Sequence, residues 1–112
     1  MTVYMVERNL KGISMEDLGA AQKAAIATGE QMSASGEPVR YIRSTFAPED
    51  GRCMCLFEGQ SAAQVQQLND TAGLPFVRIV EALDLTPCRL ARRALLRTQA
   101  EGPGGRRPVG GR

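Results

Sequence analysis

The order in which two helix patterns interrupt four strand patterns constrains the fold of this chain most strongly. Apolar and polar residues alternate with a period of two, as in half-buried strands, over residues 2–8, 39–46, 52–58 and 76–85. A helical segment from Ser14 to Gly36 follows the first strand, and another, over residues 62–72, follows the third. The resulting order, βαββαβ, predicts an α+β fold of the ferredoxin-like class with a four-stranded antiparallel sheet.

Capping residues mark the ends of both expected helices. Ser14 precedes the first helix, and Asp17, three residues later, completes an approximate capping box. Gly36 lies where a C-terminal cap belongs. Ser61 precedes the second helix, and Gly73 follows it. The two crossovers are therefore well defined by local sequence alone.

One face of the sheet is expected to lack a helical cover. Each crossover of this fold carries one helix, so we expect both helices on the same face of the sheet. The first, third and fourth strands nevertheless place apolar residues on both faces; in the first, Val3 and Met5 point away from Tyr4 and Val6. Because a solvated face does not need so many apolar side chains, we expect a homodimer that buries the second face against its own copy.

The second strand is expected to alternate without interruption over residues 39–46. Tyr41 and Arg43 would then share one face of the sheet. Ile42, Ser44 and Phe46 would share the other.

Charge divides the 112 residues into an acidic body and a basic tail. Residues 1–87 carry seven basic and eleven acidic side chains, whereas residues 88–112 carry seven arginines and one glutamate. We expect one domain over 1–87, then a tail with a short helix at 88–97 and disorder beyond it. The tail could contact anionic surfaces or nucleic acid through charge alone. Sequence-specific nucleic-acid binding is not expected, because the strands lack the aromatic pairs that stack RNA bases.

Composition excludes several kinds of chemistry. The chain has no histidine, so the commonest general base, the Ser-His and Cys-His nucleophile pairs and imidazole metal ligands are absent. No apolar run is long enough to span a membrane, and the first residues lack the basic region of a signal peptide. We therefore expect a cytoplasmic protein with no membrane partner and no covalent catalysis.

Three short motifs lie on successive elements of the expected fold: YMVER at 4–8, CLFEG at 55–59, and AGLP at 72–75. Together they resemble the motifs of a family of small bacterial ferredoxin-like proteins, long catalogued as a domain of unknown function, with a nickel-binding member. The resemblance covers about residues 2–87. It implies a dimeric fold and a role in handling nickel or another transition metal, and no reaction that can be named. Gly59 stands where the family pattern has alanine.

Two cysteines are the candidate metal ligands. Cys53 and Cys55 are two apart on one strand, so both thiols should project from the same face, where they could bind a soft metal. A closed tetrahedral site would need two more ligands, so the sequence favours the alternative that both are small buried residues of the core. A disulfide between them is not expected, because strand residues two apart are too widely separated. Four methionines are expected as core filler rather than as thioether ligands: Met5, Met15, Met32 and Met54.

Charged residues in or near the strand ends form a second candidate set, for a small ligand: Glu7, Arg8, Arg43, Glu58, Arg78 and Glu81. If Glu7 and Glu81 approach one another, the pair could bind a hard cation or act as acid and base. The alternative is a set of exposed cross-strand ion pairs, which the sequence favours. Arg43 and Arg78 could instead recognise an anion.

The sequence thus predicts a small ligand- or metal-binding protein, with nickel suggested by the family resemblance. An alternative from another class is a small dimeric α/β-barrel enzyme that uses Glu7, Glu58 or Glu81 as a proton carrier. A carboxylate among the apolar walls of a cavity would favour the enzyme. A third interpretation is an assembly module whose tail reaches a partner.

Overall fold

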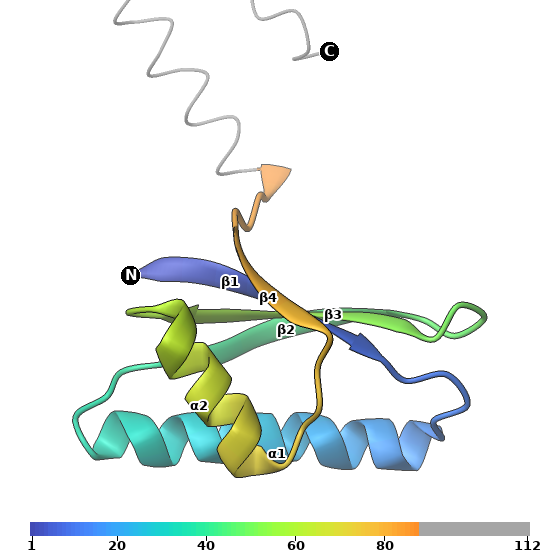
Figure 1. Ribbon diagram of the computed structural model, residues 1–112, viewed down its shortest axis with the longest axis horizontal. Helices are drawn as coiled ribbons and strands as arrows, with labels where there is room; N and C mark the ends of the chain where they lie inside the picture. The colour runs from blue at the N-terminus through green and yellow to red at the C-terminus, as the bar shows by residue number, and fades with distance from the viewer. Residues whose placement is uncertain (88–112) are drawn as a thin grey trace, which may run out of the picture.

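Four antiparallel strands form one sheet in the order β2-β3-β1-β4 in the computed structural model, which describes residues 1–87 (Figure 1). The elements are β1 (Thr2–Asn9), α1 (Met15–Ala34), β2 (Arg40–Ala47), β3 (Arg52–Gly59), α2 (Ala62–Ala72) and β4 (Arg78–Ala82). Both helices lie on the same side of the sheet, and the other side, here named the open face, has no helix over it (Figure 1). The predicted ferredoxin-like arrangement is confirmed.

The predicted caps form at the starts of both helices. Ser14 Oγ accepts a hydrogen bond from the Asp17 amide at 3.0 Å, and Ser61 Oγ accepts one from the Gln64 amide at 3.1 Å. Gly73 ends α2 in the left-handed region, with a φ of 74°. Within residues 1–87, neither helix is long and apolar enough to cross a membrane. The helix and the disorder predicted for the tail fall outside the described residues.

The last strand is shorter than the predicted span of 76–85. β4 is an edge strand that pairs only with β1, from Glu7 opposite Arg78 to Val3 opposite Ala82. Beyond Ala82 the partner strand is nearly at its first residue, so no further ladder can form. Apolar alternation continues past this point in the sequence, but a strand also needs a neighbour to accept and donate its hydrogen bonds.

The helix-facing side of the sheet forms the core. Val6 and Phe57 from the sheet pack with Val65 and Leu68 from α2, and all four are fully buried. The open face carries the alternate residues of β1, β3 and β4, which are only half-buried: Val3, Met5, Met54, Leu56 and Val80. Both faces of the sheet therefore carry apolar side chains, as expected. In β1 and β3, those on the helix-facing side are buried, whereas those on the open face are half-buried.

A bulge at Ile42 changes which residues of β2 face the helices. The pairing moves from Tyr41 opposite Phe57 to Arg43 opposite Leu56, so Ile42 is left without a partner. The prediction that Tyr41 shares a face with Arg43 is therefore wrong. Tyr41 lies on the helix-facing side, and its ring meets the edge of the Phe57 ring at a centroid distance of 5.5 Å. The sequence of β2 alternates normally and gives no sign of the extra residue.

Gly51, in the turn between β2 and β3, offers a test of backbone packing. Its φ is 78°, and an added Cβ would lie 2.5 Å from Lys11 Cα. Gly36 has a φ of 94° with nothing within 4 Å of an added Cβ. We predict that Gly36→Ala lowers the free energy of unfolding by about 1 kcal/mol, the cost of left-handed backbone strain. Gly51→Ala should lower it clearly further, as measured by urea denaturation; equal losses would contradict the close approach to Lys11.

Candidate functional site

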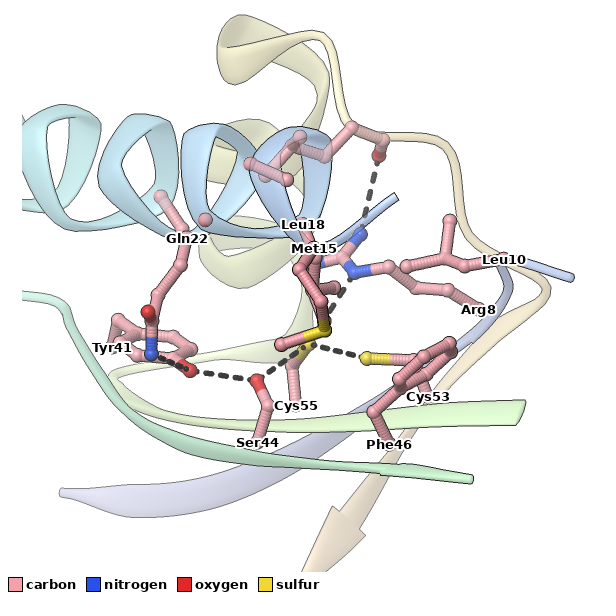
Figure 2. Close-up of a pocket in the computed structure, with 14 residues that line it drawn as sticks. Arg8, Leu10, Met15, Leu18, Gln22, Tyr41, Ser44, Phe46, Cys53 and Cys55 are labelled. Atoms are coloured by element: carbon pink, nitrogen blue, oxygen red, sulfur yellow. Dashed lines mark hydrogen bonds between the residues drawn. The ribbon is translucent and has the colours of Figure 1, made fainter. Parts of the chain in front are cut away.

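A cavity of about 210 Å³ lies between α1 and the sheet (Figure 2). The space exists because α1 presents small residues here, among them Gly19, Ala21 and Ala25. Larger apolar residues complete the wall: Leu10, Met15, Leu18, Phe46 and Leu74. Polar groups come from five residues of β1, β2 and β3 and from one of α1: Arg8, Tyr41, Ser44, Cys53, Cys55 and Gln22. An apolar cavity with a few convergent polar groups is typical of a ligand-binding site.

The two cysteines of β3 lie side by side at this cavity. Both belong to the helix-facing side of the strand, as predicted, and their side chains are buried. The Sγ atoms of Cys53 and Cys55 are 3.7 Å apart, and both thiols are free. The two cysteines are part of the core and also line the cavity. Being buried core residues therefore does not prevent them from serving as metal ligands.

A chain of hydrogen bonds crosses the cavity and ends at Cys55 (Figure 2). Gln22 Nε2 donates to the Tyr41 hydroxyl at 3.0 Å, and that hydroxyl lies 2.7 Å from Ser44 Oγ. Ser44 Oγ donates to Cys55 Sγ at 3.0 Å, and Arg8 Nε donates to the same sulfur at 3.4 Å. The bulge in β2 is what brings Tyr41 onto this face together with Ser44.

Arg8 is a buried cation, only 5% exposed. Its Nη2 donates to Asn69 Oδ1 at 2.6 Å, and its Nη1 donates to the backbone carbonyls of Leu74 and Pro75. In residues 1–87, the ion pairs that form involve other arginines, and none joins a carboxylate to Arg8. A buried charge is costly unless an opposite charge lies nearby. Among the hydrogen-bond partners of Arg8 given above and the sulfur of Cys55, which Arg8 Nε contacts at 3.4 Å, the sulfur alone belongs to an ionisable group.

The local environment keeps Cys53 protonated at neutral pH. The pKa of the Cys53 thiol is raised to about 12, chiefly by burial and in part by the charge and the hydrogen bond of the neighbouring Cys55. The Arg8 guanidinium acts in the opposite direction. Without a ligand, therefore, Cys53 is a neutral thiol in contact with its neighbour.

The other predicted ligand-binding residues lie away from the cavity, and most form ion pairs on the open face. The pairs are Glu7 with Arg78, Glu58 with Arg40, and Arg43 with Asp84. The arginines are more than half exposed, so these pairs stabilise the fold little. The sequence-based preference for cross-strand ion pairs is confirmed for Glu7 and Arg78.

Glu7 and Glu81 do not form the carboxylate pair that the sequence allowed. Glu7 lies opposite Arg78 on the open face, whereas Glu81 lies opposite Tyr4, whose ring is turned to the helices. No carboxylate lines the cavity, and the described part of the chain holds no group of three or more Cys, Asp or Glu side chains suited to a metal. The enzyme interpretation, which needs a carboxylate in an apolar cavity, gains no support.

Three of the four methionines predicted as core filler lie outside the core: Met5 and Met54 are half-buried on the open face, and Met15 lies at the cavity. Met15 departs most from the prediction, because it is 77% exposed. It is the first residue of α1, one turn before Leu18, and follows the N-cap directly. The position beside the cap was the available signal, because the end of a helix has fewer neighbours than its middle.

Comparison with known proteins shows a family. The family model described as "Nickel responsive protein SCO4226-like" matches residues 4–82. Among solved structures, SCO4226 from Streptomyces coelicolor A3(2) is similar, with a TM-score of 0.64 and 27% sequence identity over 75% of this chain and 99% of that chain. No curated protein gives a significant match. Since the family match spans the sheet from β1 to β4 with both helices, this chain belongs to the SCO4226-like family of nickel-responsive proteins.

Proposed function

We propose that this chain is a homodimeric, cytoplasmic metal-binding protein that holds its metal in the cavity through the thiolates of Cys53 and Cys55. The observation that carries the proposal is the 3.7 Å separation of the two sulfur atoms at a cavity wall. A metal–thiolate bond is about 2.3 Å long, so two sulfurs at this separation can bind one ion. A reducing cytoplasm would keep both thiols available.

Nickel itself does not fit the donors of this cavity. Imidazole suits Ni(II), and square-planar or tetragonal arrangements of nitrogen and oxygen ligands are typical of it. The chain has no histidine, and no carboxylate lines the cavity. Besides the two thiols, the cavity offers only uncharged oxygen and nitrogen groups from Gln22, Tyr41 and Ser44, and the cationic Arg8. The family description names a response to nickel. For this chain we propose that Cys53 and Cys55 bind a metal other than nickel.

The metal-binding proposal predicts thiol-dependent stoichiometry. Reduced protein titrated anaerobically with Zn(II), Ni(II) or Cu(I) should bind one ion of a thiophilic metal per chain in native mass spectrometry, and Ni(II) only weakly. The Cys53→Ser/Cys55→Ser variant should lose this ion, because no other pair of thiols lines the cavity. Cys88→Ser removes the third cysteine and should bind normally. Retention of the ion by the double variant would contradict the proposal.

The dimer is proposed to form through the open face of the sheet. Its apolar centre is half-buried in the single chain, and the three ion pairs lie on the same face around it. A face with an apolar centre and charges of both signs can pair with its own copy across a two-fold axis. The helical side of the sheet already has its cover and needs no partner.

Sedimentation equilibrium tests this interface. We predict a dimer at micromolar concentration for the wild type. Leu56→Lys places an unpaired charge at the centre of the open face. Because burial of an unpaired charge costs more than about 1.4 kcal/mol, the dissociation constant of the dimer should rise at least tenfold. Ala63→Lys adds the same charge at an exposed position of α2 and should leave the dimer intact. A monomeric wild type would overturn the assignment.

A further inference from the structure

Three sulfur-bearing side chains line one small cavity. Cys53 and Cys55 reach it from β3, and Met15 reaches it from the first turn of α1 (Figure 2). Methionine is usually buried, yet Met15 is 77% exposed here, so its thioether is not committed to core packing. An accessible, flexible thioether at a cavity that is also lined by two thiols adds a third ligand for a soft metal.

The chemistry of these donors discriminates between metals. Thiolate and thioether sulfur select soft ions such as Cu(I), whereas harder ions prefer imidazole or carboxylate. The cavity lining includes neither a carboxylate nor a histidine. Oxygen and nitrogen reach it only from uncharged Gln22, Tyr41 and Ser44 and from the cationic Arg8. The donor set thus favours a soft ion of low coordination number.

The buried charge of Arg8 discriminates further, by the charge of the ion. Two thiolates with a monovalent ion carry one net negative charge, which the adjacent Arg8 guanidinium neutralises. Two thiolates with a divalent ion are neutral, and Arg8 would stay buried without an opposite charge, as no ion pair in residues 1–87 includes it. Because an uncompensated buried charge is unfavourable, the cavity as a whole favours the monovalent ion.

Hydrogen bonds already orient one of the ligands. Cys55 Sγ receives a hydrogen bond from Arg8 Nε at 3.4 Å and one from Ser44 Oγ at 3.0 Å. Donors of this kind hold a metal-bound thiolate in place and stabilise its charge. Binding replaces the two thiol protons with the ion, and both protons pass to solvent.

Building on the proposed thiol site, we propose that the cavity binds one Cu(I) ion through Cys53, Cys55 and Met15, with Arg8 as its countercharge. Compared with the site of the proposed function, this site has a specified soft, monovalent ion, a third ligand from α1 and a buried arginine that balances its charge.

The first test measures selectivity in the wild-type protein. Cu(I) affinity is obtained anaerobically by competition with bicinchoninate, and Zn(II) and Ni(II) affinities by competition with chromophoric chelators. We expect Cu(I) to bind at least a hundredfold more tightly than Ni(II), and more tightly than Zn(II). Cysteine-dependent binding in which Zn(II) or Ni(II) equals Cu(I) would overturn this inference and leave the proposed thiol site standing. Absence of any cysteine-dependent binding would overturn both.

The second test separates the third ligand from general packing. Met15→Leu keeps the size of an exposed side chain and should weaken Cu(I) binding by roughly tenfold or more, the loss expected when a contributing group of a metal site is removed, with little change for Zn(II). Met54→Leu alters a methionine on the open face and should change neither affinity. Equal Cu(I) affinity in Met15→Leu and wild type would remove Met15 from the site and overturn the proposal.

The third test addresses the countercharge. Arg8→Met should lower the ratio of Cu(I) to Zn(II) affinity by roughly tenfold or more, because it removes the cation that a monovalent complex needs. An unchanged ratio would exclude the electrostatic role of Arg8. If this buried substitution prevents folding, Arg8→Lys keeps the positive charge and should keep the ratio near that of the wild type. A ratio that falls tenfold in Arg8→Lys would contradict a role based on charge.

Discussion

Both helices of this chain cover the same side of its four-stranded sheet, and this arrangement decides which strand residues are buried. The helix-facing residues of β1 and β3 become core, while their immediate neighbours in sequence remain half-buried on the open face. The core side is filled by Phe57, Val65 and Leu68 under α2. Under α1, small residues leave space instead. The cavity and the apolar open face are thus two consequences of one layered arrangement.

Within that arrangement, Arg8 connects more elements than any other polar side chain described above. From β1 it reaches Cys55 on β3, Asn69 on α2 and the carbonyls that lead into β4. Asn69 is itself fixed by donating to the carbonyl of Val65 at 2.8 Å. A guanidinium has enough donors to satisfy such a set of acceptors, which a lysine lacks. The arginine therefore contributes to the packing of α2 and to the electrostatics of the cavity simultaneously.

Much of the fold could be predicted because its signals are local. Ser14, Ser61 and Gly73 act through hydrogen bonds and backbone conformations that involve neighbours within a few residues. The pairing of Cys53 with Cys55 on one face follows from strand periodicity in the same way. These features need no knowledge of what lies across the sheet.

The features that escaped prediction depend on partners distant in sequence. The length of β4 is limited by where β1 begins, and the position of Tyr41 depends on an unpaired residue that alternation does not reveal. Arg8 looked like one of several charged strand residues, and only the packing of α2 separates it from the exposed Arg78. The burial of Arg8 and its hydrogen bonds to α2 therefore depend on the tertiary structure and cannot be recognised in the sequence around it.

The bulge at Ile42 has a consequence for how copies of this protein can associate. β2 forms one border of the sheet, where unsatisfied backbone groups could recruit a strand from another molecule. An irregular border offers such a strand no continuous ladder, so growth of the sheet sideways, the route to fibrous aggregates, is disfavoured. The additional residue in β2 therefore has two effects. It turns Tyr41 toward the helices, and it makes this edge of the sheet a poor template for polymerisation.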